Sequence, residues 1–354
     1  MYDRFIKWTV VICGLSLLYA CVSSIEFDTL EDAQEILTIQ ASLVQGSPHT
    51  FTAHITTLNG FEGTFTGGIG TGVALFNDRG QQVSVPRIGP RDFRLEIPQG
   101  SPDFVVEDFM EFRVRISTND GRTFDSSMEQ LLPVPEIEEL EYSLIEILEP
   151  GAQGQLFPQT RIGVFVTTSA MIPNTQDNLS LRWTFEEVFR VTDVRNQLCY
   201  VTQGIRSFDE NVFTPTFLTG TRLDDFQVFA DIIRATYSEG NYLIALQQSL
   251  TPSAAKYFED LNALINRDPS IFTGPGGQIE SNFTNINDPN DDVFGYFFAT
   301  TIDTVRMFIP PESVGSPAAC CVIDEDRALE CQDVNCGNCL RTARSTTERP
   351  FWWR

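Results

Sequence analysis

The sequence predicts a mainly β protein, in which an N-terminal immunoglobulin-like β-sandwich is followed by a larger, mostly β domain with one amphipathic helix and a cysteine-rich C-terminal tail. Three observations support this fold class. Short runs of alternating apolar and polar residues recur through the chain, one segment has the period of a helix, and the cysteines gather near the end. The length of 354 residues accommodates two domains, each large enough to bury a core.

Alternating side chains define the strands of the first domain, which we place at residues 36–135. Residues two apart in a strand point to the same face, so alternation of apolar and polar residues gives one face that packs on the core and one that is exposed to solvent. The predicted strands include 37–43, 72–76, 93–97 and 112–116. Turn signals lie between them, at 77–80 and 119–121. We expect the domain to end at Pro133-Val134-Pro135, because proline interrupts strand pairing.

The second domain, which we place at residues 136–319, contains further strands and the single helix. The predicted strands are 161–167, 181–185, 225–233, 242–249 and 293–299. Thr251 can cap a helix, and Pro252 suits its first turn, so we predict a helix near 252–266. Its large apolar and aromatic residues fall on one stripe that we expect to face the core: Tyr257, Phe258, Leu261, Leu264 and Ile265.

The N-terminus has the order of a secretory signal. Basic residues precede an uncharged run at 8–20, which is shorter than the roughly 20 residues of a membrane-spanning helix. The run ends in Leu17-Leu18-Tyr19-Ala20-Cys21, which resembles a lipobox, the sequence before a cysteine that becomes a lipid anchor. We therefore predict a lipoprotein signal peptide at 1–20, lipidation of Cys21 and an acidic tether at 21–35. An ordinary signal peptide followed by a chance cysteine is the alternative.

The chain is strongly acidic. Its formal net charge is −24, and removal of residues 1–20 leaves 22 basic and 47 acidic residues, which gives −25. A surface of this sign repels phosphate backbones, which excludes nucleic acid as a partner. It suits a protein that a tether holds away from an anionic membrane surface.

Six cysteines remain if Cys13 is removed with the signal and Cys21 is lipidated. They are Cys199, Cys320, Cys321, Cys331, Cys336 and Cys339. An even set in an exported protein favours disulfides, and six cysteines allow 15 pairings. Because Cys320 and Cys321 are adjacent, we expect each to bond a different partner. The last three have the C-x4-C-x2-C spacing of an iron–sulfur protein, but no fourth cysteine follows, so we interpret the residues 320–354 as a stapled tail that packs on the second domain.

Three other segments contain residue types that are common in binding sites. The glycine cluster from Gly60 to Gly72 leads into a strand rather than a helix, so a mobile loop is favoured over a phosphate-binding loop. His49 and His54 would need a third metal ligand that the sequence does not identify. The Asn/Asp-rich loop at 285–292 suggests calcium, but Val293 stands where an EF-hand requires glycine, so Asx turns are favoured. We predict no cofactor and no metal site.

Several motifs in this order resemble the DUF4249 family of Bacteroidota outer-membrane lipoproteins. They are the strand 37–43, Asp120-Gly121-Arg122, Pro133-Val134-Pro135, Leu181-Arg182-Trp183, the helix at 253–265, Asn285-Ile286-Asn287-Asp288-Pro289, Gly295-Tyr296-Phe297, Cys336-Gly337-Asn338-Cys339 and Pro350-Phe351-Trp352-Trp353. The resemblance implies an outer-membrane, lipid-anchored protein that works beside a TonB-dependent transporter barrel. The ligand is not implied.

The leading hypothesis is therefore a non-enzymatic accessory or substrate-binding partner of such a transporter. No G-x-S-x-G motif occurs, and only two histidines could act as a base for a nucleophile, so we name no catalytic residue. Two alternatives stay open. The many carboxylates could serve an exported hydrolase that acts on glycans, and sandwich domains also serve as cell-surface adhesin modules.

Overall fold

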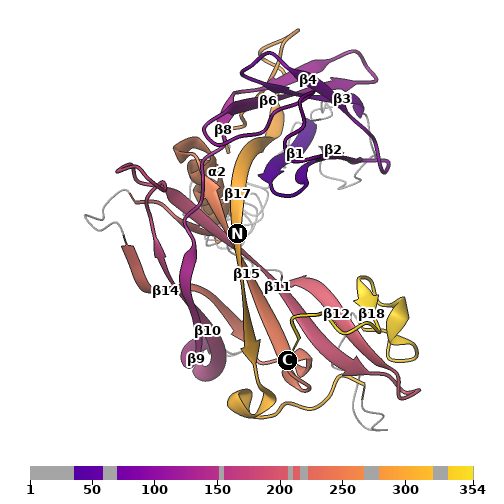
Figure 1. Cartoon of the computed structure of the whole chain (residues 1–354), viewed down its shortest axis with the longest axis vertical. Helices are drawn as coiled ribbons and strands as arrows, with labels where there is room; N and C mark the ends of the chain where they lie inside the picture. Colours follow the sequence, from indigo (N-terminus) through magenta and orange to yellow (C-terminus); the bar gives the residue numbers. More distant parts are fainter. Residues whose placement is uncertain are drawn as a thin grey trace, which may run out of the picture.

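The computed structural model describes residues 36–58, 70–150, 155–205, 210–215, 222–266, 279–321 and 334–353. The predicted signal peptide, the tether, the lipidation site Cys21, the glycines from Gly60 to Gly68 and Cys331 lie outside the described residues. The described part is mostly β, with three sheets and one α-helix, as the sequence predicts (Figure 1). No helix of this part is long and apolar enough to cross a membrane.

The largest sheet has nine strands and runs the length of the molecule. In spatial order they are β18 (Ser345–Thr346), β12 (Leu198–Ile205), β11 (Ser180–Thr192), β15 (Asn241–Leu250), β17 (Val293–Ile309), β1 (Ile36–Gln45), β2 (His49–Leu58) and β5 (Asp92–Ile97), with β13 (Asn211–Phe213) beside β11. Neighbouring strands are antiparallel except β1 and β17, which run parallel and place Leu37 opposite Val293. The first strand is therefore held between β2 and a strand from the end of the chain.

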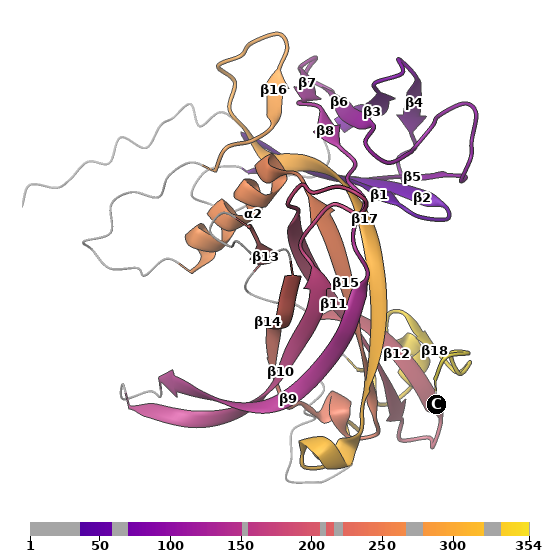
Figure 2. The same cartoon turned by 60° about the vertical axis from the view of Figure 1, so that its left-hand side comes forward.

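A sandwich forms where a second sheet covers β17, β1, β2 and β5 (Figure 2). The covering strands are β16 (Phe283–Asn285), β7 (Thr123–Ser126), β6 (Glu111–Thr118), β3 (Gly70–Asn77) and β4 (Gln82–Val85), with β8 (Glu129–Gln130) beside β6. Their inward side chains share one core with those of β1 and β2, as the period-two pattern predicts. Phe283, Val293 and Phe297, from late in the chain, also belong to this core.

The second core lies between the other half of the large sheet and a three-stranded sheet. The three strands are β14 (Arg222–Ile232), β10 (Leu156–Ser169) and β9 (Ile137–Pro150). Val164 and Val166 of β10 pack with Trp183 of β11 and Leu243 of β15, and all four are buried. The strand β17 is long enough to serve both cores and joins the two halves of the molecule (Figure 1).

The helix α2 (Pro252–Ile265) follows β15 and confirms the predicted segment, including its cap: Thr251 accepts a hydrogen bond from the amide of Ala254. The predicted core stripe is only partly correct. Phe258 is buried, but Leu264 and Ile265 are 46% and 48% exposed. The helix begins beside β17, and its end points away from the sheet, so the last turn has no sheet to cover it (Figure 2). Short 3-10 helices occur at Ala235–Tyr237, Pro311–Val314 and Cys339–Arg341.

Candidate ligand-binding cleft

A cleft of 540 Å³ lies where the outer face of the sandwich meets α2 and β11. This volume is within the roughly 300–1,000 Å³ of small-molecule sites. Five strands, the helix and two loops contribute the lining residues, which are Gln40, Ala41 and Ser42 (β1), Thr52, Ala53 and His54 (β2), Asp92, Phe93 and Arg94 (β5), Arg182 (β11), Tyr257, Phe258 and Leu261 (α2), Tyr296 and Phe298 (β17), and Ile88 and Glu210 from the loops before β5 and β13. The cleft thus brings together residues that are far apart in the chain.

Aromatic rings form one wall of the cleft. The ring of Tyr257 stacks on that of Tyr296, with 4.8 Å between centroids, and Phe258 meets Phe298 edge to face at 5.3 Å. The hydroxyl of Tyr296 donates a hydrogen bond to Oε1 of Glu129 at 2.5 Å. Both strand and helix therefore hold these rings in place, which reduces the entropy lost when a ligand packs against them.

Glu129 lies behind the aromatic wall and fixes it to the start of α2. Its carboxylate, in a residue only 2% exposed, accepts hydrogen bonds from the hydroxyls of Thr251 at 2.6 Å, Ser253 at 3.2 Å and Tyr296. Burial raises the pKa of Glu129, and the hydrogen bonds oppose this shift. Burial and the neighbouring Glu129 also raise the pKa of Tyr296, which keeps this phenol protonated as a donor.

Arg182 forms the second wall. Its guanidinium lies over the ring of Phe258, 4.3 Å from the centroid, donates to Glu210 at 2.5 Å and donates to Gln248 at 2.8 Å. The backbone of Glu210 is held in turn by Asn262 of α2: the amide nitrogen of Glu210 donates to Oδ1 at 2.5 Å, and its carbonyl accepts from Nδ2 at 2.7 Å. The ion pair is thus attached to both the sheet and the helix.

The floor of the cleft is polar and comes from the outer face of β1, β2 and β5. His54 contacts Asp92 at 2.7 Å, and the hydroxyls of Ser42 and Thr52 are 3.1 Å apart. His49, the other candidate histidine, is five residues away on the same strand and therefore on the opposite face, where it is buried and burial lowers its pKa. The two do not form a metal pair, and no group of three metal-ligating side chains occurs in the described part of the chain.

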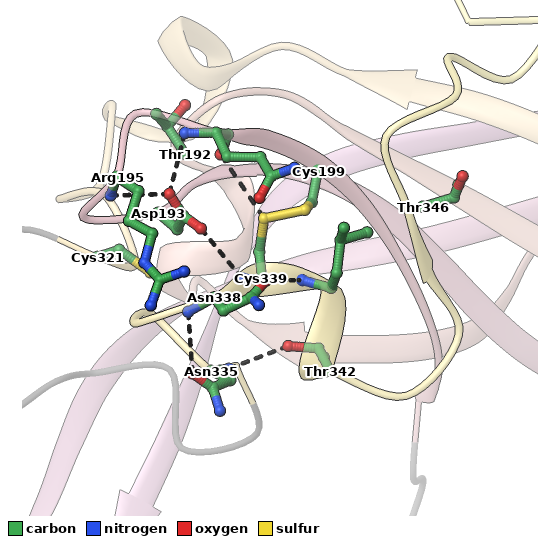
Figure 3. The surroundings of a disulfide bond; sticks show 12 residues. Thr192, Asp193, Arg195, Cys199, Cys321, Asn335, Asn338, Cys339, Thr342 and Thr346 are labelled. Carbon is green, nitrogen blue, oxygen red and sulfur yellow. Dashed lines mark hydrogen bonds between the residues drawn. A yellow bond between two sulfur atoms is a disulfide. The ribbon is translucent and has the colours of Figure 1, made fainter.

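The cysteines lie at the other end of the large sheet, where the bond between Cys199 and Cys339 attaches the tail to β12 (Figure 3). Cys199 bonds Cys339, with 6.0 Å between Cα atoms, and Cys321 bonds Cys336, at 5.3 Å. Cys320 is also in a disulfide. The adjacent Cys320 and Cys321 therefore have different partners, as expected from their sequence, and Cys336 and Cys339 are not free to bind a metal.

A buried aspartate supports the first of these disulfides. Asp193, in the turn between β11 and β12, accepts hydrogen bonds from the amides of Arg195 and Gln197, both at 2.9 Å, and from the amide of Cys339 at 3.3 Å (Figure 3). These hydrogen bonds lower the pKa of Asp193, and the bond from the amide of Gln197 has the largest effect. The tail thus packs on the second half of the molecule through both covalent and polar contacts.

The Asn/Asp-rich loop uses its side-chain oxygens internally, as the Asx interpretation predicts. Oδ1 of Asn285 accepts from the amide of Asn287 at 2.9 Å, and Oδ1 of Asp288 accepts from the amide of Asn290 at 3.0 Å. Asp291 accepts from Asn285 at 2.8 Å and pairs with Arg122 at 3.2 Å. The loop lies beside β7, and none of its residues lines the cleft.

Sequence reasoning missed most of the cleft. Tyr257 and Phe258 were predicted only as core residues, and Glu129, Arg182 and Tyr296 were given no role in a site. One signal was present in the sequence. The hydroxyl of a tyrosine needs a hydrogen-bond partner or water, so Tyr257 was more suited to the half-buried wall of a cleft than to a fully buried core. The partners of Glu129 and Arg182 come from distant segments and leave no local pattern.

Comparison with known proteins identifies one family. The family model described as "Domain of unknown function (DUF4249)" matches residues 22–306. A solved structure described as the "Crystal structure of tetra-tandem repeat in extending region of large adhesion protein" is similar over 78% of this chain and 49% of its own, with 10% sequence identity and a TM-score of 0.18. This chain therefore spans about half the length of that structure. No curated protein matches the sequence.

Proposed function

Because the chain belongs to the DUF4249 family, we propose that it is an outer-membrane lipoprotein, anchored through Cys21, that acts as a non-enzymatic partner of a TonB-dependent transporter. In this proposal the cleft holds a substrate before it enters the transporter barrel. The lipobox that ends at Cys21 is the observation that supports the location, and an acidic segment follows it as a tether.

The arrangement of the cleft supports binding rather than hydrolysis. Its carboxylates are engaged with neighbouring side chains: Asp92 contacts the ring of His54 at 2.7 Å, and Glu210 forms an ion pair with Arg182. A glycosidase instead uses one carboxyl group that is protonated to act as an acid and one that attacks or activates water. Glu129 has a raised pKa, but it is buried behind Tyr296 and does not line the cleft.

The test is isolation of the native complex. An epitope tag inserted after Gln176, in an exposed turn, leaves both cores and the cleft intact. After gentle detergent extraction of the outer membrane, we expect mass spectrometry to identify a transporter barrel that co-purifies in a ratio near one to one. Purification of the tagged protein alone from membranes that contain the barrel would contradict the proposal.

Cys21→Ser provides the matched control. This substitution removes the sulfur that carries the lipid, so we expect an unprocessed, unlipidated protein by intact-mass measurement and loss of the barrel from the purification. If the variant is lipidated and processed normally, the anchor is assigned to the wrong residue.

A further inference from the structure

We propose that the cleft beside Tyr257 and Tyr296 binds an uncharged oligosaccharide. This inference rests on the binding role proposed above and adds the chemical class of the ligand. Three independent properties of the cleft lead to it: its charges are already paired, its surface combines aromatic faces with hydroxyl and carboxylate oxygens, and the strands that line it have no free backbone edge.

Paired charges disfavour an ionic ligand. Each charged side chain that lines the cleft already has a partner: Asp92 contacts the ring of His54 at 2.7 Å, Arg94 pairs with Glu96 at 2.9 Å, and Arg182 pairs with Glu210 at 2.5 Å. A charged ligand would have to displace one partner and leave it uncompensated in a partly desolvated site. The net charge of −24 repels anions further.

The mixture of surfaces suits a sugar ring, which has an apolar C–H face and a rim of hydroxyl groups. Tyr257 is half-buried and stacks on the buried ring of Tyr296, so it supplies a rigid aromatic surface for the apolar face. Across the cleft, Gln40, Ser42 and Thr52 supply an amide and two hydroxyl groups. A carboxylate has about four acceptor positions, so Asp92 and Glu210 can accept hydrogen bonds from sugar hydroxyls while they keep their contacts with His54 and Arg182.

The backbone around the cleft disfavours an extended peptide, which commonly adds a strand to a free sheet edge. The strands β17, β1 and β2 each have a neighbour on both sides. The outer edge of β5 is covered by the preceding loop: the carbonyl of Asp92 accepts from the amide of Ile88 at 2.9 Å, and the amide of Arg94 donates to the carbonyl of Pro86 at 3.1 Å. A ligand in the cleft is therefore recognised by side chains.

Calorimetric titration of the full-length lipoprotein in detergent micelles tests this proposal. The neutral probes are maltohexaose, cellohexaose, laminarihexaose, mannohexaose and xylohexaose, and the comparison probes are hexagalacturonate and hexaalanine. We expect at least one neutral hexasaccharide to bind, with hexagalacturonate and hexaalanine at least about tenfold weaker.

Two variants assign the binding to the cleft. Tyr257→Ala removes one aromatic face, and we expect about tenfold weaker binding. Thr52→Trp places a large side chain on the exposed floor of the cleft, where a strand tolerates it, and we expect binding to be lost. Phe351→Ala is the matched control, because this aromatic residue is 97% exposed and far from the cleft in the fold; its binding should equal that of the wild type.

Three results would overturn the proposal. They are the absence of binding by every neutral hexasaccharide, equal or tighter binding of hexagalacturonate or hexaalanine, and wild-type binding by both Tyr257→Ala and Thr52→Trp. None of these results changes the co-purification of a transporter barrel, so the failure of the ligand class and the failure of the accessory role can be distinguished.

Discussion

Tyr296 donates its hydroxyl hydrogen to Glu129, and the 2.5 Å between the two oxygens joins a wall of the cleft to a carboxylate that is 2% exposed. Burial raises the pKa of Glu129, whereas an exposed glutamate has a pKa of 4.5. The folded protein therefore keeps this proton to a higher pH than the unfolded chain does. The stability that accompanies the protonated group is fully present below about pH 4.5 and is lost as the pH rises through the folded pKa.

Glu129→Gln tests this linkage, because glutamine stays neutral and can still accept from Thr251. We expect the wild type and the variant to have similar free energies of unfolding near about pH 4.5, and the variant to be the more stable of the two near about pH 7.5. Urea unfolding at both pH values measures the difference. A difference that does not change with pH would show that the folded pKa of Glu129 is ordinary.

Gly295 is required where β1 and β17 pair. Its φ is +109°, and a Cβ atom there would overlap the carbonyl oxygen of Ile39. We expect Gly295→Ala to lower the free energy of unfolding by more than about 3 kcal/mol, because backbone atoms cannot yield as a side chain can. Gly204→Ala in β12 is the control, with open space around the new methyl group, and urea unfolding should place it within about 0.5 kcal/mol of the wild type.

The two described disulfides should differ in their contributions because they close chains of different length. Cys199 and Cys339 are 140 residues apart, whereas Cys321 and Cys336 are 15 apart. Replacing both members of the first pair by serine should cost about 4–5 kcal/mol, and replacing the second pair about 3 kcal/mol, because a longer closed loop removes more unfolded-state entropy. Denaturant unfolding of the two double variants gives both values, and the reverse order would contradict this account.

Two of the aromatic residues near the C-terminus should differ in their effect on stability: Trp353 should stabilise the fold, and Phe351 should not. Trp353 is 5% exposed, and its ring lies 5.1 Å from that of Tyr200 and 4.9 Å from that of Tyr242. We expect Trp353→Ala to cost about 3 kcal/mol, whereas Phe351→Ala should change the free energy of unfolding by less than about 0.5 kcal/mol. Thermal or urea unfolding checks both variants, and similar losses for the two would mean that the tail packs differently.

Local patterns predicted the elements of the fold well. The alternation at 37–43 and 112–116 corresponds to β1 and β6, and the cap at Thr251 begins α2. These features depend on neighbours in the sequence, where side-chain period and capping chemistry act directly. The error at Leu264 and Ile265 has the same origin: the period shows which residues share a face but not where the covering sheet ends.

The pairing of distant strands could not be predicted in this way. Nothing near Ile39 indicates that its strand runs parallel to one that contains Gly295, because the close approach is a property of both strands together. The cleft follows from that pairing, since it needs β1 beside β17 and α2 beside β17. The sequence therefore shows which residues are present but does not show that the fold brings them together in one cleft.

The position of β1 also decides how the molecule responds to a pull on its N-terminal segment. Force that enters at Ile36 runs along a strand bonded to β2 on one side and to β17 on the other. Both ladders then carry the load in shear, with many hydrogen bonds strained at once, rather than opening one bond at a time from an edge. A tether at this point would therefore pull on a strand that is hydrogen-bonded along both sides.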